Sequence, residues 1–165
     1  MKVIFLDIDG VLATRSSISA WHARMTKLVQ TGNNDEIEAE IAQRKSPGGN
    51  AGELDSACVG LFLRLLDITK ANVVISSSWR YDKRNDKIWQ DLFGDKYIGK
   101  TRRDLDSGRG DEIQEWLDKH PEVDKFVILD DESCDMGNRI KFMVETEMIG
   151  GFTDWQFSQC LQRLI

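Results

Sequence analysis

Short apolar runs alternate along this chain with stretches in which apolar residues recur at helical spacing. Three runs are rich in β-branched residues and end in polar ones, which is typical of buried strands: KVIFLDI (2–8), NVVISSS (72–78) and KFVILDDES (125–133). Two shorter runs, KYIGKT (96–101) and KFMVET (141–146), predict weaker strands.

Between the runs, apolar residues at i, i+4, i+7 and i+8 predict helices with one buried face. The apolar positions of these helices fall within 54–66, 88–93, 113–117 and 157–164. Thr153 and Gln156 form a T-x-x-Q capping box just before the last of them. Because strands alternate with helices, the pattern favours an α/β fold with a mostly parallel sheet.

Residues 15–53 depart from this alternation, since they are mostly polar. Trp21, Met25 and Leu28 keep helical spacing, a shorter helix holds Ile37 and Ile41, and SPGGNAG (46–52) is a loop sequence. We expect a small helical insertion within a single domain that spans residues 1–165.

The composition is that of a soluble globular protein, with 165 residues, 41% hydrophobic and 30% charged. The apolar run at the start is too short for a signal peptide, and none reaches the roughly 20 residues of a membrane span. The three cysteines lack metal-ligand spacing. We therefore expect a cytoplasmic protein with reduced thiols and no contact with a membrane.

A net charge of −6 argues against broad, nonspecific nucleic-acid binding. Positive charge is nevertheless dense between Arg80 and Arg103, where it also includes Lys100 and Arg102. This basic segment, residues 80–103, is either a local patch for a polyanion or a solvated surface.

Polar groups suited to chemistry follow the three strong strands. They are Asp7 and Asp9, then Ser76 and Ser77, then Asp130 and Asp131. The carboxyl ends of parallel strands meet at one edge of a sheet, where ligands bind in such folds. Turn formation would explain any one of these sets, but three sets together predict a site.

The paired carboxylates of this edge repel one another and need a positive partner. Carboxylate and carbonyl oxygens suit a hard cation, and Mg²⁺ is the usual choice where a phosphate supplies further oxygens. A calcium EF-hand loop is the other interpretation of D-x-D-G, but its twelfth position would be Ile18 and not Glu.

The same residues resemble the motifs of the haloacid dehalogenase (HAD) superfamily of phosphotransferases. FLDIDGVL (5–12) is similar to the first motif, VVISS (73–77) to the second and VILDD (127–131) to the acidic fourth. The third motif is a single cation, for which Arg109 in GRGDEIQEWL fits best and Lys100 is the alternative. The resemblance implies a Rossmann-like three-layer sandwich in which residues 15–53 form a small cap.

More narrowly, SSSWR, RGDEIQEWL, VILDDES and GGFTDWQF resemble the HAD domain of Swiss Army Knife RNA repair proteins, relatives of polynucleotide 3′-phosphatases. This resemblance implies a Mg²⁺-dependent phosphomonoesterase that acts on nucleic-acid 3′-phosphate ends or nucleotides. A small-molecule phosphatase and a HAD-like binding module without activity are the alternatives.

The resemblance also implies a role for each matching residue. Asp7 would attack phosphorus, and Asp9 would protonate the leaving oxygen and then activate water. Ser76, with Ser77 beside it, and Arg109 would hold the phosphoryl oxygens.

The metal would be bound by the Asp7 side chain, the Asp9 carbonyl and Asp130, with Asp131 orienting metal-bound water. Arg80 and Arg15 follow the second and first motifs closely, so each either touches substrate or pairs with a surface carboxylate.

Overall fold

A computed structural model describes residues 1–102 and 106–165. Arg103, at the end of the basic segment, lies outside the described residues. The described chain contains a parallel sheet of five strands in the order β3-β2-β1-β4-β5. The strands are β1 (Lys2–Leu6), β2 (Asn72–Ile75), β3 (Tyr97–Lys100), β4 (Lys125–Asp130) and β5 (Met143–Glu145). All five expected strands are present, and the α/β prediction is confirmed.

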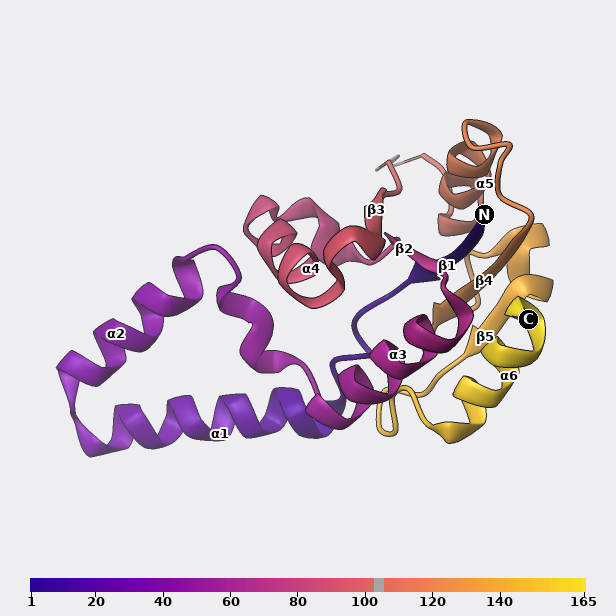
Figure 1. The fold of residues 1–165 in the computed structure, drawn as a ribbon. Coiled ribbons are helices and arrows are strands. Elements are labelled where there is room, and N and C mark those ends of the chain that lie inside the picture. The colour runs from indigo at the N-terminus through magenta and orange to yellow at the C-terminus, as the bar shows by residue number, and fades with distance from the viewer. Residues whose placement is uncertain (103–105) are drawn as a thin grey trace.

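Helices cover both faces of the sheet, which gives three layers (Figure 1). Along β1, Ile4 and Leu6 point into the core under α3 (Ser56–Thr69), α4 (Asp86–Phe93) and α6 (Asp154–Leu164). Val3 and Phe5 point to the opposite face, which α5 (Arg109–Asp118) covers. This alternation explains why both strand faces are apolar, since a sheet covered on both sides buries every strand residue.

The ends of the helices follow local sequence signals. Asp55 caps α3 by accepting from two backbone N–H groups of the first turn, and the predicted Thr153–Gln156 capping box at α6 is present. Leu54 therefore precedes its helix instead of belonging to it. The Gln156 amide also donates to the Glu145 carbonyl at 3.1 Å, which ties the start of α6 to the end of β5.

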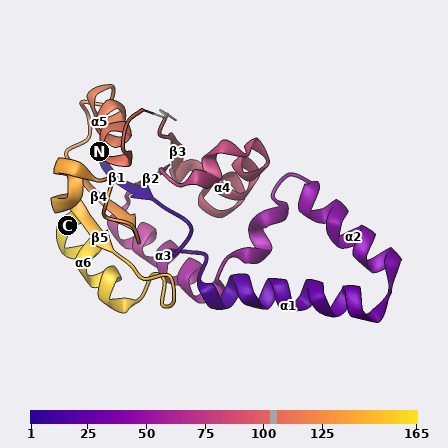
Figure 2. The same cartoon turned by 180° about the vertical axis from the view of Figure 1, so that it is seen from behind.

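The insertion between β1 and α3 forms the two expected helices, α1 (Arg15–Thr31) and α2 (Asn34–Lys45). Together they project away from the sheet as an arm, seen from both sides in Figures 1 and 2. No residue of α1 is buried, so contacts within the arm hold it together. One of these contacts places the Arg44 guanidinium 3.9 Å from the centre of the Trp21 ring.

The loop prediction for 46–52 is only partly correct, because Gly49–Glu53 forms a short 3-10 helix. Within the described part of the chain, no helix is both long and apolar enough to cross a membrane.

Candidate active site

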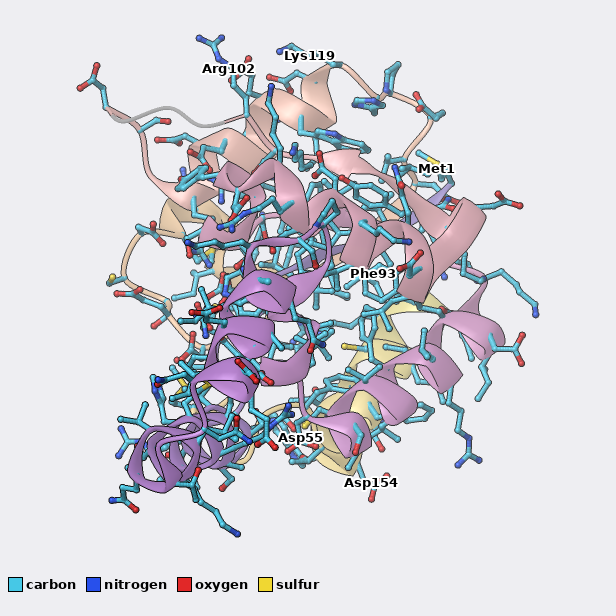
Figure 3. The ribbon with its side chains drawn as sticks, turned by 90° about the vertical axis from the view of Figure 1, so that its left-hand side faces the viewer. Met1, Asp55, Phe93, Arg102, Lys119 and Asp154 are labelled. Atoms are coloured by element: carbon cyan, nitrogen blue, oxygen red, sulfur yellow. The ribbon has the colours of Figure 1, made fainter. Side chains whose placement is uncertain are left out.

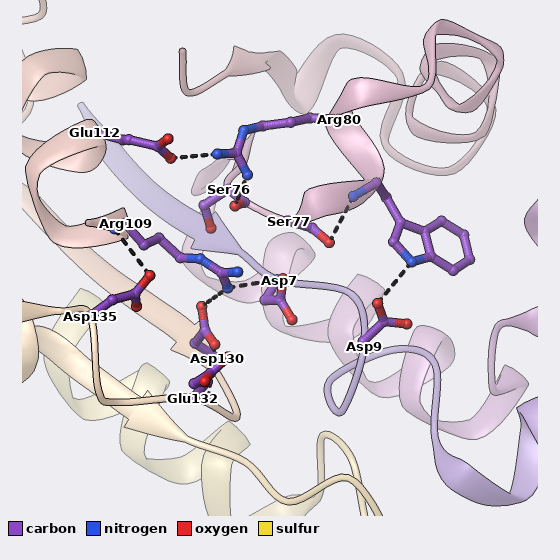
Figure 4. Close-up of polar contacts among 11 residues, drawn as sticks. Asp7, Asp9, Ser76, Ser77, Arg80, Arg109, Glu112, Asp130, Glu132 and Asp135 are labelled. Atoms are coloured by element: carbon purple, nitrogen blue, oxygen red, sulfur yellow. Dashed lines mark hydrogen bonds and ion pairs between the residues drawn. The ribbon is translucent and has the colours of Figure 1, made fainter. Parts of the chain in front are cut away.

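The middle strand of the sheet delivers Asp7 to the edge where the three strong strands end. Asp7 directly follows β1, and its backbone N–H donates to the Leu129 carbonyl of β4 at 2.9 Å. The side chain is only 6% exposed. Ser77, which follows β2, hydrogen-bonds the Asp7 carboxylate, and Asp130 ends β4 on the other side of β1. The predicted meeting of strand ends is therefore present (Figure 4).

Arg109 lies between two of the carboxylates of this edge. Its Nη1 atom is 3.0 Å from Asp7 Oδ1 and also pairs with Asp130 Oδ2. Lys100, the alternative cation of the third motif, instead donates to Asp86 at 2.8 Å. The geometry therefore selects Arg109 as the cation of the site.

The start of α5 is held against the loop after β4, and this contact positions Arg109. The Arg109 backbone N–H donates to Asp135 Oδ2 at 3.2 Å, and the Gly110 N–H donates to the Asp135 carbonyl at 3.1 Å. A Cβ atom on Gly110 would lie 2.1 Å from the Met136 carbonyl oxygen, so only glycine allows this approach.

Burial and charge together perturb the acidity of the carboxylates. Burial, with a further contribution from the Asp130 charge, raises the pKa of Asp7 to about 7, although Arg109 and the Ser77 hydroxyl oppose the shift. Burial also raises the pKa of Asp130 and of Asp131. A positive charge beyond that of Arg109 would therefore stabilise the ionised cluster.

Asp7, Asp130 and Asp131 offer oxygen atoms that all lie within 4.8 Å of one another, the one such acidic group among the described residues. Gly10 allows the Asp131 side chain to lie close to the turn after β1. Its φ is +70°, and a Cβ atom there would lie 2.3 Å from Asp131 Oδ2. A compact set of hard oxygen donors with raised pKa values fits Mg²⁺.

Asp9 lies beside this cluster with its side chain turned to a different partner. The Trp79 indole N–H donates to Asp9 Oδ2 at 3.1 Å. Burial raises the pKa of Asp9, and the Trp79 hydrogen bond and the Arg109 charge oppose that shift. The sequence pattern did not indicate this contact of Trp79, although its position just after the second motif was the available signal.

The two serines of the second motif differ in their surroundings. Ser77 contacts Asp7 and also accepts from the Trp79 backbone N–H at 3.3 Å. The Ser76 hydroxyl is buried and has no hydrogen-bond partner among the described residues. Ser77 therefore contacts the Asp7 carboxylate, and phosphate binding by Ser76 stays a prediction.

Arg80, a candidate for substrate contact, pairs with a residue outside the acidic cluster. It pairs with Glu112 of α5, with both side chains 4% exposed, and also donates to the Ser76 carbonyl. The expected pairing with a surface carboxylate is wrong, because Glu112 is buried, and contact with a substrate stays a prediction. Arg15 is exposed at the first turn of α1, where its backbone N–H donates to the Met148 carbonyl at 2.8 Å.

Cations of the basic segment are extensively paired with carboxylates. The ion pairs include Arg84–Asp82, Lys87–Asp91, Lys100–Asp86 and Arg102–Glu115. Glu115 also binds Lys119, so Arg102 and Lys119 project from the same end of the molecule (Figure 3). This pairing favours the interpretation of the segment as a solvated surface.

One family of known proteins matches most of the chain. The family model described as "HAD domain in Swiss Army Knife RNA repair proteins" matches residues 3–157. A haloacid dehalogenase-like family hydrolase from Streptococcus pneumoniae is similar in structure, with a TM-score of 0.49 and 12% sequence identity. That similarity covers 96% of this chain and 89% of the other. No curated protein matches the chain.

Proposed function

The chain belongs to the family of HAD domains found in Swiss Army Knife RNA repair proteins, which places it among the HAD-type hydrolases, and we propose that it is a Mg²⁺-dependent phosphomonoesterase. The observation that carries this proposal is the position of Asp7. It directly follows the central strand, contacts Ser77 and Arg109, and lies within reach of two further aspartates.

Asp7 would act as the nucleophile. Its carboxylate oxygen forms a bond to phosphorus as the bond from phosphorus to the leaving oxygen breaks, which gives an aspartyl-phosphate. Ser77 and Arg109 can bind the oxygens of the transferred group, because both already contact the Asp7 carboxylate.

Asp9 would move the protons of the reaction. In its acid form it gives a proton to the leaving oxygen, and the resulting carboxylate then takes one from the water that hydrolyses the aspartyl-phosphate. The raised pKa of Asp9 suits the first of these roles, and the Trp79 hydrogen bond suits the second by stabilising the carboxylate.

Asp7, Asp130 and Asp131 would hold Mg²⁺, with the Asp9 carbonyl as a further oxygen donor. When bound, Mg²⁺ supplies Lewis-acid stabilisation of the negative charge on the phosphoryl oxygens. The chain's own contribution is to fix these donors on strand ends and on the Gly10 turn.

The proposed substrates are nucleic-acid 3′-phosphate ends or nucleotides, in keeping with the RNA repair context of the family. Arg15 is a candidate contact for the substrate because it is exposed on the first turn after the Asp9 loop. A phosphatase for small molecules is the second candidate. The ion pairs of the basic segment favour it, since paired cations offer little to a polyanion.

Hydrolysis of a substrate panel with Mg²⁺, and with a chelator instead, tests the proposal. The panel comprises an aryl phosphate, mononucleotides and oligonucleotides with a 3′-phosphate. We expect Mg²⁺-dependent release of phosphate from all three, with the highest kcat/KM on the oligonucleotide. A higher kcat/KM on mononucleotides would favour the second candidate, and no turnover of any substrate would favour a binding module.

Salt dependence separates a polymer substrate from a small one. If the protein binds phosphates beyond the scissile one, the KM for an oligonucleotide rises with salt. The logarithm of the association constant should then fall by about 0.7 per phosphate contact for each tenfold increase in salt concentration. Arg102→Glu should weaken that dependence. Lys141→Glu, just before β5 and outside the basic segment, is the control of equal charge change. Equal effects on a mononucleotide would argue against polymer contacts.

A further inference from the structure

A cavity of about 900 Å³ opens beside the proposed active site. It lies between the ends of β4 and β5 and the first turn of α6, where Asp131, Glu145, Glu147 and Trp155 line it. No part of the proposed chemistry uses the last three of these residues. Because Asp131 also belongs to the acidic cluster with Asp7, the cavity and the active site share a wall.

The walls of the cavity are fixed by contacts of the backbone. The Phe152 N–H donates to the Val11 carbonyl at 2.9 Å, which holds the loop after β5 against the turn that carries Asp9. A Cβ atom on Gly151 would lie 2.9 Å from the same carbonyl oxygen, so the approach is close. The cavity therefore keeps a set position relative to Asp7.

The charge of the lining selects among possible ligands. Asp131, Glu145 and Glu147 are carboxylates, and no Lys, Arg or His is among the described lining residues. Ionised carboxylates only accept hydrogen bonds. They repel a second phosphate, so the cavity suits a group that is rich in N–H donors.

Trp155 supplies a flat apolar surface in the same place. The residue is 62% exposed, although large aromatic residues are usually well covered. An exposed indole is suited to stacking with a planar ring. The hydroxyl of Thr146, which also lines the cavity, is buried without a hydrogen-bond partner among the described residues.

We propose that this cavity binds the base of the nucleoside that carries the scissile phosphate, with a preference for guanine. The inference rests on the proposed phosphatase function. Guanine presents an N–H and an amino group side by side, which match the two oxygens of a carboxylate. Uracil presents one N–H between two carbonyl groups, and these carbonyls are repelled by carboxylates. A polyamine would satisfy the charges but not the indole.

Inhibition by free nucleosides tests the cavity separately from the chemistry. Guanosine should inhibit hydrolysis of an aryl phosphate at concentrations about tenfold lower than uridine. Trp155→Ala should weaken inhibition by guanosine about tenfold. Trp155→Phe keeps a stacking surface and should retain most of the affinity for guanosine. Glu147→Gln should reduce the preference for guanosine over uridine. Glu122→Gln, an exposed change of equal charge before β4, is the matched control and should alter neither.

Calorimetry with guanosine, uridine and spermidine requires no turnover, so it tests the cavity even if the phosphatase proposal fails. Equal affinity for both nucleosides, tighter binding of spermidine, or guanosine binding that Trp155→Ala leaves unchanged would each overturn the proposal. Failure of aryl phosphate hydrolysis would overturn the phosphatase function alone. Comparing guanosine 3′-phosphate with an oligonucleotide that ends in it tells whether the base comes from a free nucleotide or a polymer end.

Discussion

The Arg109 guanidinium and the Asp7 carboxylate form an ion pair of 3.0 Å at the carboxyl end of the central strand. The same nitrogen also pairs with Asp130. One positive charge thus separates two carboxylates that burial would otherwise force toward protonation. It offsets only part of the effects of burial and of repulsion between the carboxylates, since the pKa of Asp7 remains raised to about 7. The site is therefore prepared for a further cation.

Asp7→Asn should abolish turnover, because an amide is a poor nucleophile and a poorer metal ligand. Without metal, the same change should increase the free energy of unfolding by about 1–2 kcal/mol at pH 8, since it removes a buried charge. Steady-state kinetics and urea denaturation measure the two effects. Near-normal activity of Asp7→Asn would rule out the nucleophile, and a loss of stability would contradict the electrostatic account.

The metal-free protein should become less stable as the pH rises from about 4 to about 7. Folded Asp7 has a pKa of about 7 against an ordinary value of 3.8, so the folded state binds more protons than the unfolded state in this window. Stability from this group is complete below pH 4 and is lost as Asp7 ionises. Asp7→Asn should flatten the profile, and identical profiles for both proteins would contradict the assignment.

Trp79→Phe should shift the pH–rate profile upward by roughly half to one pH unit, because Asp9 loses the N–H that stabilises its carboxylate. Trp89→Phe is the matched control. Trp89 is fully buried, and its indole N–H has no hydrogen-bond partner among the described residues. The control should reduce stability without moving the profile. A shift in both variants, or in neither, would show that Trp79 does not act through Asp9.

Arg80 and Glu112 should behave as a structural pair and not as substrate contacts. Glu112→Gln should cost about 3 kcal/mol of unfolding free energy, since it leaves a buried guanidinium without its counter-charge. The double variant Arg80→Met/Glu112→Met should be more stable than Glu112→Gln, which urea denaturation can measure. A variant that retains stability but raises KM for oligonucleotides alone would instead support substrate binding by Arg80.

Local pattern was sufficient for much of the fold. The strands at 2–6, 72–75 and 125–130 are buried on both faces, so their apolar runs are continuous and their ends stand out in the sequence. The strand ends in turn locate Asp7 and Asp130, because parallel neighbours end at one edge. The helix that begins at Arg109 likewise follows from its sequence pattern.

The missed contacts join residues that are distant along the chain. Trp79 is 70 positions from Asp9, and Arg80 is 32 positions from Glu112. Each pair depends on how the segment after β2 packs, which no local pattern specifies. The choice between Ser76 and Ser77 depends on one residue of register, because successive side chains leave a strand in opposite directions.

Mass spectrometry of the acid-quenched protein during turnover tests the central claim most directly, because an aspartyl-phosphate on Asp7 is a covalent species. We expect the peptide that contains Asp7 to gain one phosphoryl group in the wild-type protein with Mg²⁺. The modified fraction should be larger in Asp9→Asn, in which hydrolysis of the aspartyl-phosphate is slowed, and absent in Asp7→Asn. Two results together would contradict the proposed nucleophile. One is turnover by Asp9→Asn with no phosphoryl group on this peptide, and the other is activity of Asp7→Asn.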